Sequence, residues 1–271
     1  MRSFPNGVFM AGALLALAGG PLAAQQLPRS QARLLQIFRE QIKTGHEAAH
    51  VTTERAWPAA FARAKSPDYY LAMESLTGRP EVWYVAPWDS YTAWGTAMAR
   101  DRANPTLSAD LEKAAAADAA HVESLDIVEA MGMPELSHGD FPDLNRMRFW
   151  EISVWRLRPG HDRQFAEVTA AYKKVASRAA PNARWRTYAV QAGMPGPTYI
   201  IFSSVEAFEQ FDAMLAQGAS AMQAMTPEET ALFEKFFRES VISMVTNKYR
   251  LNPAMSYVSA ETKATDPAFW K

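Results

Sequence analysis

The sequence predicts an α+β fold made of two tandem ferredoxin-like repeats, and two observations support this prediction. The stretch RPGHDRQF at 158–165 has a weaker copy, KTGHEAAH, at 43–50. In each copy a strand-like run ends at a glycine and a helical pattern begins, and the segments that follow keep the same order. The offset between matching positions grows only in turns, from 115 residues at Gly45 and Gly160 to 122 at Glu112 and Glu234.

Residues 1–24 have the pattern of a secretory signal peptide. Arg2 precedes a short apolar run at 8–18, which is followed by a Gly-Pro pair and the small residues Ala23 and Ala24. The run is shorter than the roughly 20 residues that an apolar span needs, so we expect cleavage after Ala24 and no membrane anchor. The sequence therefore predicts a periplasmic or secreted protein, without distinguishing between the two.

The composition excludes several classes of function. Removal of the signal peptide leaves about 247 residues, and 48% of the chain is hydrophobic, which is enough for a large core. The 28 basic and 29 acidic residues are interspersed, so no surface for nucleic acid or an anionic membrane is predicted. The chain has no cysteine, which excludes thiolate catalysis, cysteine zinc sites and iron–sulfur clusters.

The first repeat is expected at 30–130. Its strands are predicted from runs of β-branched and aromatic residues, and its helices from apolar residues three and four positions apart. Pro58 lies inside the first helical segment, where it removes a backbone donor and should kink or split the helix. The expected elements are a strand at 34–42, a helix at 46–65, strands at 69–75 and 81–86, helices at 90–100 and 108–120, and a strand at 122–129.

The second repeat is expected at 147–258, after a linker at 131–146 and before a C-terminal tail at 259–271. Phe165, Val168 and Tyr172 have the spacing of an amphipathic helix. Thr226 is a plausible N-cap for a later helix, with acidic residues in its first turn. The expected elements are a strand at 149–157, a helix at 161–178, a hairpin of 184–191 and 198–203, helices near 205–215 and from 227, and a strand at 241–251.

The predicted strand that leads into RPGHDRQF, together with the aromatic-rich hairpin that follows in the sequence, resembles the dimeric α+β barrel superfamily. This superfamily includes the antibiotic-biosynthesis-monooxygenase-like and NIPSNAP-like domains, and the resemblance covers 34–257. It implies that the two sheets form one pseudo-dimeric barrel within the chain. Members include oxygenases, haem-degrading enzymes and proteins of no known activity, so the fold alone implies no single reaction.

Residues 46–50 read HEAAH, which matches the H-E-x-x-H pattern of zinc proteases. The second repeat has His161 and Asp162 at the same place, so a Gly-His-acid helix start belongs to the repeat itself. No third ligand stands out downstream. We therefore predict no metal site and retain His46 and His50 only as weak candidates for metal ligands.

The first repeat differs from the second on the helix face that should cover the sheet. His50 replaces Phe165 and Thr53 replaces Val168, so this inner face is more polar in the first repeat. Departures from a pattern tend to lie at functional sites, although a buried histidine can equally be a hydrogen-bonded core residue. The predicted ligand-binding residues are His50, His46, Trp57, Trp83 and Arg39.

Three functions remain open. The favoured one is an exported protein that binds a small, largely apolar or aromatic molecule in a pocket between the sheet and helices of the first repeat. The alternatives are a cofactor-independent oxygenase or haem-processing enzyme, with His50 as base or ligand, and a non-catalytic interaction module. The second repeat adds Arg156 beside Trp155, a pair that could bind an anionic aromatic ligand or lie in solvent. The sequence identifies no cofactor and leaves open whether the chain forms a homodimer.

Overall fold

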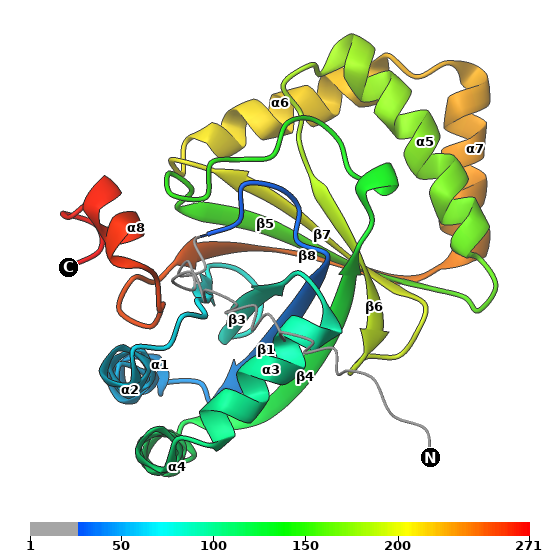
Figure 1. The fold of residues 1–271 in the computed structure, drawn as a ribbon. Coiled ribbons are helices and arrows are strands. Elements are labelled where there is room, and N and C mark those ends of the chain that lie inside the picture. Colours follow the sequence, from blue (N-terminus) through cyan, green and yellow to red (C-terminus); the bar gives the residue numbers. More distant parts are fainter. Residues whose placement is uncertain (1–26) are drawn as a thin grey trace, which may run out of the picture.

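The computed structural model describes residues 27–271, so the signal-peptide pattern at 1–24 lies outside the described residues. Within that range no helix is long and apolar enough to cross a membrane. Antiparallel strands close into a barrel with helices around its outside, which confirms the predicted α+β class (Figure 1).

The elements follow the predicted order closely. The first half contains β1 (Leu34–Ile42), α1 (Glu47–Glu54), α2 (Ala56–Ala64), β2 (Leu71–Ser75), β3 (Glu81–Trp88), α3 (Tyr91–Arg102), α4 (Pro105–Asp118) and β4 (Val122–Gly132). The second contains β5 (Phe149–Leu157), α5 (Asp162–Ala179), β6 (Arg186–Ala192), β7 (Thr198–Val205), α6 (Gln210–Gln223), α7 (Pro227–Ser240) and β8 (Val241–Leu251). Thr226 is the N-cap of α7, as predicted, and in addition forms a capping box with Glu229.

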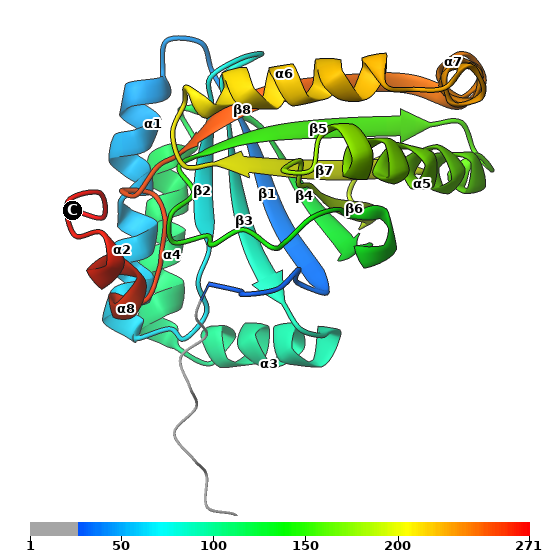
Figure 2. The same cartoon turned by 90° about the horizontal axis from the view of Figure 1, so that it is seen from above.

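The barrel joins two sheets that have the same internal strand order. Around the barrel the order is β1-β3-β2-β8-β5-β7-β6-β4, and β4 pairs with β1 to close it. Each half therefore places its first strand between its third and fourth. The halves meet where β2 pairs with β8 and where β4 pairs with β6. Figure 2 shows α5, α6 and α7 on one side of the barrel and α1, α2 and α4 on the other.

The helix predicted at 46–65 is interrupted, whereas α5 in the second half is continuous. The break lies at Arg55, three residues before Pro58. The proline ring would clash with the carbonyl of Glu54, one turn back, and proline donates no hydrogen bond to it. The chain therefore ends α1 at that residue and restarts as α2.

Each half turns into its first helix at a glycine with a left-handed backbone. Gly45 has a φ of +86° and Gly160 a φ of +84°, and a β-carbon added at either would meet no atom within 4 Å. Any cost of a larger residue at these positions therefore comes from backbone conformation and not from collision.

Replacing Gly160 with alanine should lower the free energy of unfolding by roughly 1 kcal/mol, because alanine is strained in a left-handed conformation. The same change at Gly45 should cost about as much. Gly218, inside α6, provides the control: alanine there meets nothing within 4 Å and should stabilise the helix. Chemical denaturation of the three variants measures the difference, and equal effects at all three positions would contradict the assignment.

Alternate residues of each strand face either the barrel interior or the surrounding helices. All eight strands of the described chain contribute to the interior core, which includes Ile37, Trp83, Ile152 and Tyr249. The outer faces form separate cores with the helices. The C-terminal segment joins the interior: it forms α8 (Ala260–Thr265), and Trp270, which is 6% exposed, packs against the barrel core.

Candidate functional site

A cavity of about 260 Å³ lies inside the barrel. Its walls come from five strands and from the loop between β6 and β7, so both halves of the chain contribute. The lining residues are Arg39, Glu81, Trp83, Ile152, Val154, Arg156, Met194, Pro195, Thr198, Ser243, Val245, Asn247 and Tyr249. The cavity is thus partly apolar and aromatic, and partly polar.

The polar wall is organised around Glu81, which is 4% exposed. Its carboxylate accepts a hydrogen bond from Arg39 Nε at 2.6 Å and another from the Tyr249 hydroxyl. Burial raises the pKa of Tyr249, and the nearby Glu81 charge raises it further, so the hydroxyl stays protonated and can donate. Glu81 therefore fixes both side chains against the cavity.

The aromatic wall is formed by Trp83, which is 1% exposed. The Arg39 guanidinium lies 5.4 Å from the centre of this ring, within the range of a cation–π contact. The rings of Tyr249 and Phe202 pack against Trp83 at 5.8 and 6.3 Å. Arg39 and Arg156 supply two positive charges among the lining residues, against one negative charge from Glu81. The cavity can therefore accept an aromatic group together with an anion.

A second cavity, of about 90 Å³, lies inside the barrel and is lined by a different set of side chains. Its lining is mostly apolar and includes Leu35, Met73 and Trp150 from the strands. Part of its wall comes from Leu27 and Phe141, which lie before β1 and in the linker. At this volume the cavity is too small for most organic ligands.

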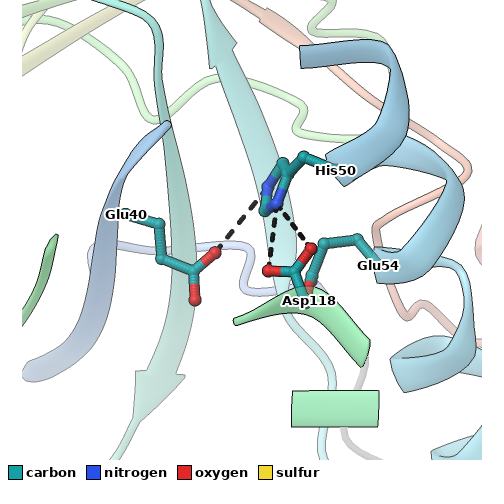
Figure 3. A group of neighbouring side chains, drawn as sticks. All are labelled: Glu40, His50, Glu54 and Asp118. Atoms are coloured by element: carbon teal, nitrogen blue, oxygen red, sulfur yellow. Dashed lines mark hydrogen bonds and ion pairs between the residues drawn. The ribbon is translucent and has the colours of Figure 1, made fainter. Parts of the chain in front are cut away.

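A second polar group lies outside the barrel, between the sheet of the first half and its helices. His50 of α1 is fully buried, as predicted for a residue facing the sheet. Its Nδ1 lies 2.9 and 3.1 Å from the two carboxylate oxygens of Asp118, at the end of α4. Its Nε2 lies 3.7 Å from Glu40 Oε2, as Figure 3 shows. The same nitrogen lies 3.1 Å from the Tyr84 hydroxyl.

The pKa values of the carboxyl groups around His50 shift in different directions, although burial acts on all of them in the same sense. It raises the pKa of Glu54 to about 8, with a further contribution from the charge of Glu40. It also raises the pKa of Glu40 to about 7, although the His50 imidazole partly offsets this. Burial opposes ionisation of Asp118 as well, but hydrogen bonds from His50 and Thr53 outweigh it and lower the pKa of Asp118.

The five predicted ligand-binding residues lie in three places. Arg39 and Trp83 line the cavity inside the barrel. His50 and Trp57 lie on α1 and α2, outside the barrel. His46 occupies the N-cap position of α1 without a side-chain capping hydrogen bond. Its Nδ1 lies 3.0 Å from Nδ1 of His121, so the two histidines of the HEAAH motif have different partners.

Sequence reasoning missed the acidic residues of both sites. Signals for some of them existed: Glu54 follows His50 by four positions and therefore shares its helix face, and Glu40 occupies an alternate position between Phe38 and Ile42. Asp118 follows Ala114, a buried residue of α4, by four positions. Glu81 has no comparable local signal, because its partner Tyr249 lies 168 residues away.

No protein-family model and no curated protein matches this sequence. Several solved structures have a fold similar to that of this chain. A putative monooxygenase from Fusobacterium nucleatum subsp. nucleatum ATCC 25586 is 11% identical, with a TM-score of 0.55 over 81% of this chain and 92% of its own. An anthrone oxidase-like protein is 10% identical, with a TM-score of 0.53 over 83% and 94%. A putative chlorite dismutase is 13% identical, with a TM-score of 0.48 over 83% and 97%. The first two likenesses, at 11% and 10% identity, show an α+β barrel fold and no shared reaction.

Proposed function

We propose that this protein binds a small molecule with an aromatic or apolar body and an anionic group in the 260 Å³ cavity inside the barrel. One observation carries the proposal: the Arg39 guanidinium, held by Glu81, lies over the ring of Trp83 at the cavity wall. The proposed ligand therefore lies on the opposite face of the first sheet from the pocket expected between sheet and helices. On that outer face, buried polar side chains contact one another.

The lining residues indicate the class of ligand. A guanidinium recognises a carboxylate through paired hydrogen bonds, and an indole face stacks on a planar ring. The volume lies just below the usual range of ligand pockets, so a ligand with a single ring fits better than a larger one. An aromatic carboxylate of that size meets the charge, shape and volume of the cavity.

A cofactor-independent oxygenase is the second candidate. The putative monooxygenase and the anthrone oxidase-like protein, whose fold this chain shares, favour it. Glu81 is the carboxylate among the lining residues and would be the base that removes a substrate proton. Haem processing is not proposed, because the lining of neither cavity includes a histidine and the cavities do not fit that cofactor.

Arg39→Met should weaken the binding of an aromatic carboxylate about 10- to 100-fold, because a charge-assisted hydrogen bond is worth roughly 1.5 to 3 kcal/mol. Isothermal titration calorimetry with benzoate-type ligands measures this loss. The matched probe is the methyl ester of the same acid, which keeps the ring and removes the charge, and which should bind wild type and variant alike. His50→Phe, on the other face of the sheet, is the control for changes outside the cavity.

The binding proposal would be wrong if no aromatic acid bound, or if the ester bound wild type as tightly as the acid. Loss of binding in His50→Phe with full binding in Arg39→Met would return the pocket to the space between sheet and helices. Consumption of oxygen with a bound acid, abolished in Glu81→Gln while binding persists, would favour the oxygenase.

We also propose export and duplication as properties of the chain. The signal-peptide pattern at 1–24 supports export, and N-terminal sequencing of the mature protein should begin at Gln25. The common strand order and the matching turns at Gly45 and Gly160 support duplication. The interaction module remains the third candidate: exposed apolar side chains on β4 and β8, including Ile127 and Met244, favour it.

A further inference from the structure

Four potential metal ligands meet on the outer face of the first sheet. Glu40 comes from β1, His50 and Glu54 from α1, and Asp118 from the end of α4 (Figure 3). One ligating atom from each residue lies within 4.8 Å of the others. We call these residues the His50 cluster. It lies on the opposite face of β1 from Arg39, so it is separate from the proposed ligand cavity.

The imidazole of His50 is oriented as it is in many metal sites. Its Nδ1 lies 2.9 and 3.1 Å from the two carboxylate oxygens of Asp118, which accept hydrogen bonds, so Nδ1 carries the proton and donates it. The lone pair of Nε2 then points toward Glu40 and the Tyr84 hydroxyl. A carboxylate that holds Nδ1 while Nε2 binds the ion is the common second shell of a metal-bound histidine.

Among the residues that the structure describes, His50 is the one basic side chain within ion-pair distance of the carboxyl groups of the cluster. Glu40 Oε2 is buried and has no hydrogen-bond partner, and it lies 3.7 Å from His50 Nε2. Among residues 27–271 no lysine or arginine forms an ion pair with Glu40, Glu54 or Asp118. Buried carboxylates are costly without a counter-charge, so either protons or a cation must compensate them.

The second half has no histidine or carboxylate at the positions that correspond to Glu40, His50 and Glu54. By the repeat offsets, the positions of Glu40, His50 and Tyr84 correspond to Trp155, Phe165 and Ile201. These three side chains belong to one apolar core between the sheet and its helices. The position of Glu54 corresponds to Thr169, so the second half has no carboxylate there either, and packing does not explain the charged groups of the His50 cluster.

We propose that the His50 cluster binds a divalent transition-metal ion, with His50 Nε2 and the carboxylates of Glu40 and Glu54 as ligands and Asp118 holding the imidazole. One imidazole and two carboxylates suit Zn²⁺ or Mn²⁺ better than a soft or an alkaline-earth ion. The ion reaches the cluster past Glu40, whose side chain is 16% exposed while that of His50 is fully buried. The Tyr84 hydroxyl donates to Nε2 in this structure, where the ion would bind. When the ion takes that place, the hydroxyl can donate to Met255 Sδ, which lies 3.8 Å away.

Titration of chelator-treated full chain with Zn²⁺, followed by calorimetry, tests the proposal, and Co²⁺ supplies a visible absorption spectrum as a direct readout. We expect one ion per chain. Glu40→Gln and Glu54→Gln should each weaken binding at least 10-fold. Asp118→Asn should weaken it 10- to 100-fold, because a neutral amide replaces the carboxylate that orients the imidazole and raises its basicity. His50→Phe, which introduces the residue of the second half, should abolish binding.

Two matched controls distinguish this cluster from its neighbours. Glu47→Gln changes the exposed acid of the HEAAH motif and should leave affinity unchanged. His46→Gln removes one member of the His46–His121 pair and should also leave affinity and the Co²⁺ spectrum unchanged. Because Glu40 is partly exposed, Glu40→Gln keeps the test valid even if His50→Phe does not fold.

Three results would overturn the proposal. The first is that neither ion binds the wild-type chain. The second is that both glutamate variants bind as tightly as wild type. The third is that only His46→Gln loses the ion, which would place it on the His46–His121 pair.

Discussion

Replacement of Trp83 by alanine should lower the free energy of unfolding by about 4 kcal/mol, which is the usual cost of removing a large aromatic side chain from a core. Trp83 is 1% exposed and contacts the rings of Phe202 and Tyr249, so alanine would leave a void between the two halves of the barrel. The void would lie beside an existing cavity, and the core has no spare side chain there to fill it.

Two further variants separate packing from other causes. Trp83→Phe keeps a ring in place and removes a buried indole N–H that has no hydrogen-bond partner, so it should cost less than half as much. Leu215→Ala, at a residue that is 77% exposed, should be nearly neutral. Urea denaturation followed by circular dichroism measures all three. A cost below about 1 kcal/mol for Trp83→Ala would mean that this ring is not part of the core.

The order of the elements was predictable because it depends on local patterns. The strands predicted at 34–42, 149–157 and 241–251 have the observed bounds. The start of α6 differs from the prediction: the helix was expected from about residue 205 and begins at Gln210. Val205 completes β7 instead, and Phe208 lies in the turn at 51% exposure, so two apolar residues with helical spacing belong to different structures.

The sequence did not predict that the candidate residues lie on two opposite faces of the first sheet, because both faces of β1 are buried. Leu34 and Leu35 are 1% and 6% exposed, so the strand lacks the alternation that separates an inner from an outer face. Arg39 and Glu40 are therefore indistinguishable in the sequence, although one faces the cavity and the other faces His50. The prediction placed Arg39, Trp83 and His50 in one pocket for this reason.

The remaining contacts of the two sites were not predictable because they join residues that are far apart in the sequence. His50 and Asp118 are 68 residues apart, and Glu81 and Tyr249 are 168 apart. Each pair depends on how a helix returns to the sheet or how the barrel closes, and neither is encoded in a local motif. The HEAAH motif, which was the most visible local signal, contributes only one of its histidines to a buried site.

Replacement of Glu81 by alanine should have the second largest effect on stability, a loss of about 3 kcal/mol. Removal of one member of a buried ion pair leaves an uncompensated charge, which usually costs 3 to 5 kcal/mol. The lower end applies here because the Arg39 side chain is 29% exposed and water can partly replace its partner. The Tyr249 hydroxyl, which donates to Glu81, would lose its acceptor at the same time.

Glu81→Gln keeps an oxygen that can accept from Tyr249 and removes only the charge, so its loss should be about half that of alanine. The double variant Arg39→Met/Glu81→Ala completes a double-mutant cycle, and a coupling energy of about 1 to 2 kcal/mol is expected for partners in direct contact. A coupling near zero would show that Glu81 acts through Tyr249 and not through Arg39. Arg39 would then have no fixed position over Trp83, and the argument for an anionic ligand in the barrel would lose the geometry on which it depends.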